Sequence, residues 1–318
     1  MAQDAHGSQD GSHFLHPGHL IGHVKDADYF ELPRVLVGAG EDVPAAERGK
    51  LKIPQPFYQD GQAAIYAPST NLIEPFDLKV TKFMVLELVA ALIVAFLAVV
   101  LANKVRGGKL PKGRIWQALE AVLLFLRDEV ARPAIGKADA DRFLPFLWSI
   151  FGFVLACNLL GMVPWLGSPT GALGCTGTLA LFTMAAVIGA GSKQLGVVGF
   201  WKAQVPHMEL PFVLAIFLKP MVFLIEVLGM IIKHFVLAVR LLANMFAGHL
   251  VLGVLVAFVG VIWYEVTSVS HPLFLGVTTA SIVGAIALSL LELFVAFLQA
   301  YIFTFLSALF IGMAVHPH

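Results

Sequence analysis

Residues 233–249 read KHFVLAVRLLANMFAGH, and they decide how the rest of the chain is interpreted. They place Arg240 in the middle of a long apolar run. A guanidinium group does not deprotonate in proteins, so Arg240 cannot escape burial by becoming neutral. A charged side chain at bilayer depth costs roughly 2.5–3.5 kcal/mol on insertion scales. Arg240 is therefore a functional-site hypothesis, and we expect something to offset its cost.

The composition is that of a membrane protein with several spans. Of the 318 residues, 58% are hydrophobic and 13% are charged, and the mean hydropathy is +0.83. A soluble domain has about 25% charged residues. The formal net charge is zero, so charge gives no reason to expect a nucleic-acid partner. Cys157 and Cys175 fall in or beside apolar runs, where we expect small buried side chains rather than a disulfide or a metal site.

Residues 1–80 form a polar, histidine-rich head broken by proline and glycine. His16, His19 and His23 have the spacing of a helix face that could hold a metal, but Pro17 and Gly18 disfavour a helix there. We expect a flexible solvated tail without a metal site, and a metal-binding tail is the alternative.

The remainder, 81–318, is expected to be an all-α polytopic membrane domain. Its first apolar run, 83–102, reaches roughly 30 Å, which is enough to span a bilayer. Basic residues gather directly after it in 104–114. The positive-inside rule therefore places this segment in the cytoplasm and the N-terminal tail outside. Residues 113–131 have apolar side chains at three- and four-residue steps, which predicts an amphipathic surface helix that ends before Pro133.

The later apolar runs predict a hairpin of shorter spans and two long helices. The shorter spans are expected at 143–164 and 175–191, with an uncharged outside loop between them. The runs at about 211–262 and 273–315 are too long for one upright crossing each. We therefore expect two long tilted helices, joined by a polar turn and ending in the cytoplasm.

The polar residues of the first long helix lie at regular steps. Glu226, Lys233 and Arg240 are seven apart, so they share one face of a continuous helix. Asn244, four residues after Arg240, joins that face. His249 is nine residues after Arg240, so it points to the opposite face, roughly 13 Å along the axis.

On the last helix, Glu292 and Gln299 are also seven apart and share a face. His249 and Glu292 titrate and can relay protons, whereas Arg240 can only bind a carboxylate or block leakage. Several simpler readings remain open. Arg240 and Glu292 can form a buried salt bridge that fixes helix pairing, and His249 can be a core histidine. Lys233 can be an interfacial lysine that extends to the headgroups, with Glu226 as its partner.

Several stretches resemble subunit a of F-type ATP synthase, the membrane stator beside the rotating c-ring. RLLANMFAGH at 240–249 resembles its arginine signature. FLRDEVARP at 125–133 and NLLGMVP at 158–164 resemble its surface helix and the end of its second span. The segment 292–303 resembles its last helix. The resemblance covers about 80 to 318, and it implies one upright span, a surface helix, a hairpin and two long tilted helices against the ring.

The resemblance also implies residue roles. Arg240 would face the c-ring carboxylate and prevent a proton short circuit, with Asn244 and Gln299 as its polar neighbours. His249 and Glu292 would form a coupled pair in the half-channel open to the outside. The remaining positions that match polar residues of the ion path are Asn158 in the same half-channel, and Glu226 and Lys233 nearer the cytoplasm.

The implied function is proton translocation through two offset half-channels that load and unload c-ring carboxylates. The implied partners are the c-ring, the peripheral-stalk b subunits, other ATP synthase subunits and membrane lipids, in a bacterial inner membrane or, as the alternative, an organellar one. The chain has no G-x-x-x-x-G-K-[ST] loop, so we expect no cofactor and no nucleotide chemistry of its own.

Three other functions stay open at this point. One is a sodium-translocating version of the same subunit. Another is a secondary transporter that binds an anion at Arg240, for which inverted repeats and broken helices are expected and are not evident in the sequence. A membrane scaffold without transport is the third, and it leaves the intramembrane Arg240, His249 and Glu292 unexplained.

Overall fold

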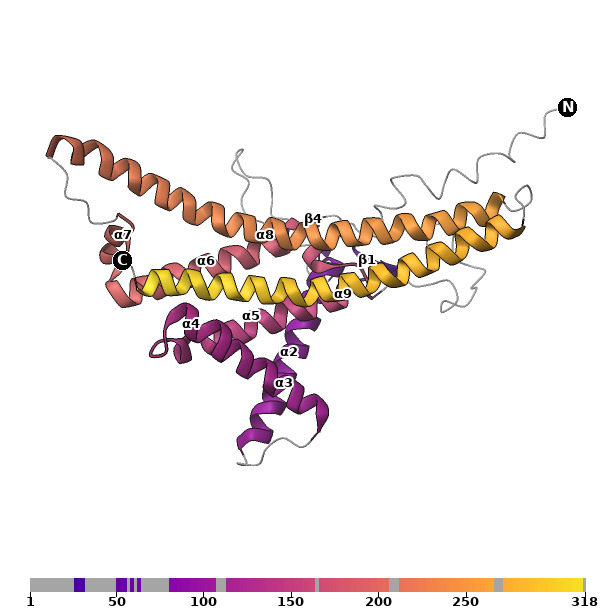
Figure 1. Cartoon of the computed structure of the whole chain (residues 1–318), viewed down its shortest axis with the longest axis horizontal. Coiled ribbons are helices and arrows are strands. Elements are labelled where there is room, and N and C mark those ends of the chain that lie inside the picture. The colour runs from indigo at the N-terminus through magenta and orange to yellow at the C-terminus, as the bar shows by residue number, and fades with distance from the viewer. Residues whose placement is uncertain are drawn as a thin grey trace. The chain divides into compact units, whose positions relative to one another are not determined.

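The computed structural model of the chain is drawn in Figure 1. It describes residues 26–31, 50–55, 58–59, 62–63, 80–106, 113–163, 166–205, 212–265 and 271–316. Helices make up most of this part of the chain: α2 (Lys82–Arg106), α3 (Arg114–Phe125), a π-helix (Leu126–Ala131), α4 (Arg132–Ile135), α5 (Ala140–Gly161), a 3-10 turn (Pro169–Gly171), α6 (Leu173–Leu195), α7 (Val197–Ala203), α8 (Phe212–Glu265) and α9 (His271–Val315).

Five of the described helices are long and apolar enough to cross a membrane. They are α2, α5, α6, α8 and α9. The described strands are short and form two separate antiparallel pairs, β1 (Tyr29–Glu31) with β2 (Lys50–Lys52) and β3 (Tyr58–Gln59) with β4 (Gln62–Ala63). The prediction of an all-α polytopic membrane protein is therefore confirmed.

The chain divides into two compact units. Unit 1 consists of Met1–Ala90, Cys157–Ala172 and Met245–Leu293, and unit 2 consists of Ala91–Ala156, Leu173–Asn244 and Phe294–His318. Several helices, including α8 and α9, contribute one part to each unit. The relative positions of two residues are therefore defined where both belong to the same unit.

The long helix α8 runs without a break over 54 residues. At about 1.5 Å per residue its length is roughly 80 Å, far more than the roughly 30 Å thickness of a hydrocarbon core. Pro220 lies inside the helix without ending it. Because α8 is continuous, the spacing argument for Glu226, Lys233, Arg240 and Asn244 rests on real helical geometry.

In both units α8 pairs with α9 in an antiparallel arrangement. In unit 2, Leu237 and Leu241 of α8 are buried in one cluster with Ala300 and Phe303 of α9. In unit 1, a Cβ atom added at Gly284 of α9 would lie 3.8 Å from the side chain of Leu255 of α8. The α8 and α9 segments of unit 1 lie side by side in Figure 1.

The surface helix differs from its prediction at Pro133. Helical structure continues through a π-helical turn and α4, and ends at Gly136, whose φ of 102° suits glycine. Pro133 lies in the first turn of α4, where a missing N–H is tolerated and the fixed φ of proline is helical. The prediction that the helix ends before Pro133 was therefore wrong.

Gly312 permits a close contact between α9 and α4 in unit 2. A Cβ atom at this position would overlap the carbonyl oxygen of Ala134. The surrounding core of unit 2 takes buried side chains from every helix near this contact, including Leu126, Leu147 and Ile311. The surface helix is thus fixed to the membrane helices by backbone packing as well as by side chains.

The described parts of the N-terminal head pack onto the start of α2 in unit 1. The side chain of Gln55 exchanges two hydrogen bonds with the backbone of Val80, at 2.8 and 2.9 Å. The Asp26 carboxylate accepts a bond from the Phe83 N–H at 3.3 Å, which satisfies a free amide at the helix N-terminus. These residues form structure where the sequence suggested a flexible tail. His16, His19 and His23 lie outside the described residues.

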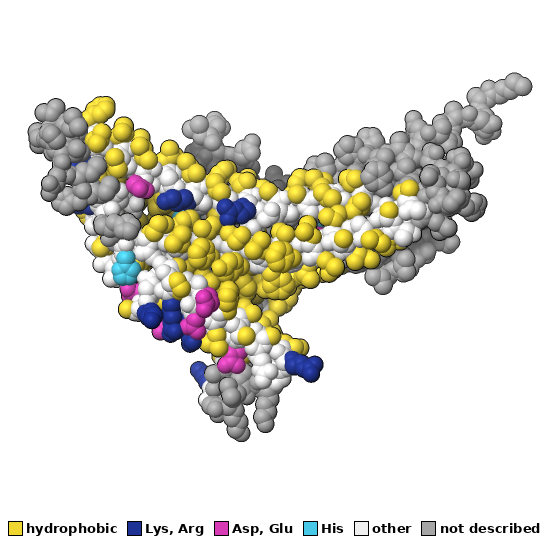
Figure 2. Space-filling model, viewed as in Figure 1, with side chains coloured by type: hydrophobic (Ala, Val, Ile, Leu, Met, Phe, Trp, Pro, Cys, Tyr) yellow, Lys and Arg dark blue, Asp and Glu magenta, His cyan; other side chains and the backbone are white. Residues whose placement is uncertain are grey.

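The exposed surface of the long helices is mostly hydrophobic. Figure 2 shows hydrophobic side chains along α8 and α9, while charged side chains gather over the region of α3 and α4. Phe217, Leu224 and Phe235 of α8 are each at least 60% exposed. Such a surface is stable next to lipid or another apolar protein surface, and not in water.

Candidate functional site

An amide pair joins the two long helices in unit 2. The Nδ2 atom of Asn244 on α8 donates a hydrogen bond of 2.9 Å to Oε1 of Gln299 on α9. Gln299 is only 2% exposed, and its Nε2 has no partner among the described residues. The pair therefore holds the amide of Gln299 in a fixed orientation and leaves both N–H groups of its Nε2 available for other acceptors.

Arg240 lies one helical turn before Asn244 on the same face of α8. It is half-buried, and no carboxylate pairs with it among the described residues of its unit. Glu226 and Lys233 precede it at seven-residue steps, and both are exposed. This face of α8 thus presents a permanent cation whose partner has to come from elsewhere.

The second polar set lies in unit 1, where Glu292 of α9 packs against the backbone of α8. A Cβ atom added at Gly248 would lie only 2.7 Å from Oε1 of Glu292, so glycine is needed for this approach. His249 is the next residue of α8. His249 Nε2 and Glu292 Oε1 are both buried without a hydrogen-bond partner in the described part of the chain. The carboxyl group of Glu292 thus reaches the turn of α8 that carries His249, without a direct bond to that nitrogen.

Asn158 at the end of α5 belongs to a buried chain of side chains in unit 1. Thr170 Oγ1 donates to Asn158 Oδ1 at 2.9 Å, and the hydroxyls of Thr170 and Ser168 are 3.0 Å apart. All three residues are at most 1% exposed. Gly161 allows the loop to fold back, because a Cβ atom there would lie 2.5 Å from Ser168 Oγ.

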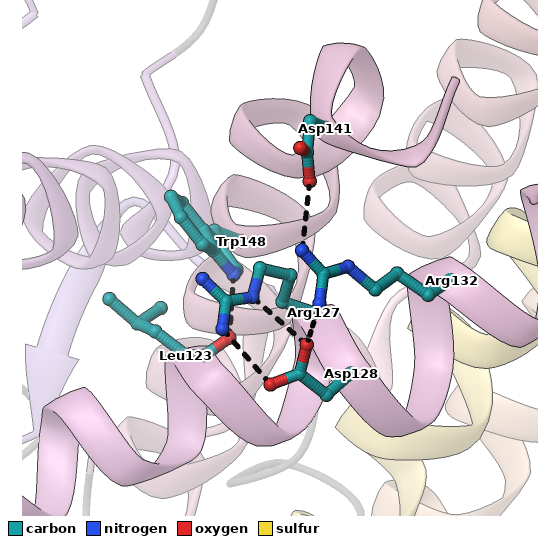
Figure 3. Close-up of polar contacts among 6 residues, drawn as sticks. All are labelled: Leu123, Arg127, Asp128, Arg132, Asp141 and Trp148. Atoms are coloured by element: carbon teal, nitrogen blue, oxygen red, sulfur yellow. Dashed lines mark hydrogen bonds and ion pairs between the residues drawn. The ribbon is translucent and has the colours of Figure 1, made fainter. Parts of the chain in front are cut away.

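A charged cluster where the surface helix meets the start of α5 is the third polar feature, and it lies in unit 2. Figure 3 shows the Asp128 carboxylate between two arginines, with Arg127 at 3.0 Å and Arg132 at 2.6 Å. Asp141 of α5 lies 3.9 Å from Arg132, and the Trp148 indole N–H donates to the Leu123 carbonyl at 3.2 Å. These contacts connect the surface helix to the start of α5.

Comparison with known proteins gives consistent results. The family described as ATP synthase A chain matches residues 84–312. ATP synthase subunit a of Myxococcus xanthus is 41% identical over 76% of this chain and 76% of the relative. The corresponding protein of Chloroherpeton thalassium is 38% identical over 76% of this chain and 68% of its own length, and ATP synthase subunit a 2 of Chlorobaculum tepidum is 37% identical over 75% and 64%.

The chain belongs to the ATP synthase subunit a family. The family resemblance deduced from the arginine motif is therefore confirmed. Membership supports the role of an ion-translocating stator subunit of the Fo sector, working with other ATP synthase subunits in a membrane that the chain crosses several times.

The predicted polar residues are divided between the two units. Arg240, Asn244 and Gln299 belong to unit 2, and they share it with the exposed Glu226 and Lys233. His249, Glu292 and Asn158 belong to unit 1. No group of three or more His, Cys, Asp or Glu residues in the described part of the chain has the arrangement of a metal site.

Three residues of these sets were not identified from the sequence. Ser168 and Thr170 fall in a loop that was read only as an uncharged outside turn. A hydroxyl-rich stretch directly after a span is a weak signal for a buried network. Gly248 was noticed only as part of the motif, although a glycine beside a titratable residue is a place where another helix can approach closely.

Asp128 gives a pH-dependent prediction. The hydrogen bond from Arg127, and then the charges of Arg127 and Arg132, hold the pKa of Asp128 below its usual range. A lowered pKa means that the ionised carboxylate stabilises the folded state above the unfolded pKa, and that this contribution is lost as the pH falls through the folded pKa. We expect Asp128→Asn to lower the unfolding temperature of the purified complex by the same amount from pH 8 to 5, and by less only below about pH 4.

Glu129→Gln is the matched control for this measurement, because Glu129 is the next residue and is exposed. We expect it to have a small effect at every pH. If the effect of Asp128→Asn already disappears between pH 8 and 6, the arginine contacts of Asp128 do not stabilise the fold.

Gly248 gives a second prediction. Gly248→Ala places a methyl group where Oε1 of Glu292 lies, so the carboxyl group has to move. If Glu292 acts in ion transport, its displacement should lower ion flux through the assembled complex by roughly ten- to hundredfold. Gly229→Ala on the same helix is the control, because nothing lies within 4 Å of a Cβ atom there. Equal flux in the two variants would contradict a role for the Glu292 position.

Proposed function

We propose that this chain translocates protons through two offset half-channels, which load and unload carboxylates of a rotating c-ring. The observation that supports this most strongly is Arg240. It is half-buried on an apolar helix, cannot lose its charge, and has no carboxylate partner among the described residues of its unit. A carboxylate on another, moving subunit would supply the missing charge in turn.

In the proposed mechanism a proton enters from outside past Asn158, Glu292 and His249. The hydroxyl chain of Thr170 and Ser168 supports the orientation of Asn158. The proton neutralises a c-ring carboxylate, and the neutral site then turns into lipid without the cost of an exposed charge.

After nearly a full turn, the site releases its proton into the other half-channel on the side of Glu226 and Lys233. The ionised carboxylate is attracted by Arg240, whose fixed charge also blocks direct proton passage. Asn244 and Gln299 fix the polar surroundings of the guanidinium through their hydrogen bond of 2.9 Å. Each elementary charge moved is worth roughly 2.3 kcal/mol per 100 mV, so several protons have to be combined for one ATP.

The proposed setting is a bacterial inner membrane, with the head 1–80 outside and the C-terminus in the cytoplasm. It follows from the basic residues in the last turn of α2 and directly after it. One of them, Lys104, lies with its Nζ atom 3.9 Å from the centre of the Trp116 ring. We also propose the peripheral-stalk b subunits and membrane lipids as partners, the latter because the exposed faces of the spans are apolar.

Replacement of Arg240 tests the proposal. Arg240→Ala should abolish proton-driven ATP synthesis in membrane vesicles while the complex still assembles. The variant loses both the barrier to direct proton passage and the cation that attracts the c-ring carboxylate. ATP synthesis that survives at the wild-type rate would refute the assignment of Arg240. The same vesicles distinguish the coupling ion, since a sodium-translocating subunit would show flux that depends on sodium at constant pH.

Exchange of His249 and Glu292 tests the proposed half-channel through which protons enter from outside. Either single replacement, His249→Glu or Glu292→His, should lower proton flux, because it places two like groups at the same turn. The double exchange should restore part of the flux, since it keeps one imidazole and one carboxyl. Flux that is unchanged in both single variants would show that these residues do not act as a pair.

A further inference from the structure

His234 is a buried titratable residue with no part in the mechanism above. It lies on α8 in unit 2 and is 3% exposed. Its ring centre lies 5.1 Å from that of Phe310 on α9. Leu237 and Leu241 continue the same buried stripe at three- and seven-residue steps. His234 therefore faces α9, whereas its neighbour Lys233 is exposed.

One hydrogen bond fixes the neutral form of the His234 ring. Nδ1 lies 2.9 Å from the Met230 carbonyl oxygen, which can only accept, so Nδ1 carries the proton. Nε2 then has a free lone pair. This nitrogen is buried and has no partner among the described residues. A phenylalanine or leucine would pack against Phe310 without this cost, so packing alone does not account for a histidine.

The α8–α9 contact of unit 2 has buried polar side chains at two levels, which are Gln299 in its pair with Asn244, and His234. The antiparallel pairing that joins Asn244 to Gln299 also joins His234 to Phe310, ten residues or about 15 Å further along α8. Between these levels, Thr304 and Ser307 of α9 are fully buried. Their hydroxyls donate to carbonyls of their own helix, at 2.9 and 2.7 Å, so their oxygens keep acceptor capacity. Buried polar groups therefore occur along α9 between the level of the amide pair and the level of His234.

We infer that His234, with its Nδ1 fixed and its buried Nε2 unpaired among the described residues, is a proton-holding residue of the exit half-channel. This inference rests on the proposed function and its topology. The Nε2 lone pair takes a proton from a protonated water and forms an imidazolium, and the same nitrogen returns the proton to water on the cytoplasmic side. Nδ1–H stays bonded to Met230 throughout, so the ring stores a proton and does not pass it from one nitrogen to the other.

Two neighbours bear on the charge of the ring. The Phe310 ring lies 5.1 Å away at an interplanar angle of 48°, and the neighbouring charge of Lys233 disfavours the imidazolium. Between residues 293 and 315, α9 carries no acidic or basic side chain, and Tyr301 is its titratable residue there. On these parts of α8 and α9, His234 is therefore the residue whose usual pKa lies near neutral.

The test uses the whole ATP synthase in sealed vesicles. His234→Phe keeps an aromatic ring for packing against Phe310, and His234→Gln keeps a hydrogen-bonding side chain that does not titrate near neutral pH. We expect both variants to assemble with the c-ring and to lower proton flux roughly tenfold. In the wild type, flux should also depend on the cytoplasmic pH between about 5 and 8, and both variants should lose this dependence while the response to the outside pH is retained.

Wild-type flux and pH response in both variants would overturn the inference. So would failure of both variants to assemble, because His234 would then be needed for packing. Arg240→Ala, measured in parallel, separates the two levels of the proposal. If it abolishes ATP synthesis while the His234 variants behave like the wild type, only the inference about His234 fails. If ATP synthesis survives in Arg240→Ala, the proposed function fails first.

Discussion

Arg240 carries a permanent charge. The guanidinium does not deprotonate, and no carboxylate among the described residues of its unit pairs with it. Much of the surrounding structure can be understood from that constraint. α8 is continuous for 54 residues, so Asn244 lies one turn from the guanidinium on the same face. Asn244 in turn bonds Gln299, which fixes how α9 lies against this part of α8. A half-buried charge with polar neighbours and no counterion among the described residues of its own unit needs an anion from another molecule. In the proposed mechanism, a c-ring carboxylate supplies this anion, and its arrival at Arg240 is a step of ion transport.

The fold could be predicted largely because apolar run lengths report directly on membrane helices. The runs that became α8 and α9 were recognised from length and composition, and their spacing pattern survived because Pro220 does not interrupt α8. Prediction failed where a local rule competed with packing. Pro133 normally predicts a helix end, but a π-helical turn and the contact of α4 with Gly312 carry the helix past it. The head was read as a tail because hydrogen bonds such as that between Gln55 and Val80 join residues 25 apart and leave no periodic signal.

For the candidate site, the sequence predicts which residues share a helix face, but it does not predict which residues touch across helices. Seven-residue spacing placed Glu226, Lys233 and Arg240 on one side of α8, and family resemblance added the roles of His249 and Glu292. No spacing rule gives the register between two helices, so the contact of Glu292 with the backbone at Gly248 needed the structure. The same holds for Thr170, which is twelve residues from Asn158 and bonds it only because a loop folds back.

The polar groups of α8 and α9 share a feature that ordinary core packing does not explain. The side chains of Gln299 and His234 each make one hydrogen bond through one atom and leave a second buried atom unpaired among the described residues, and His249 Nε2 and Glu292 Oε1 are unpaired as well. An unsatisfied buried polar group costs roughly 1–3 kcal/mol. With Thr278 Oγ1 of α9, the described parts of these two helices carry five such atoms, which lowers the stability of the fold considerably. For Gln299 and His234 the fixed bond sets the orientation while the unpaired atom can gain and lose a partner. Fully paired groups would hold the helices more firmly. In the proposed mechanism the free atoms of the imidazole and carboxyl groups take up protons, and the amide nitrogen of Gln299 can only donate a hydrogen bond.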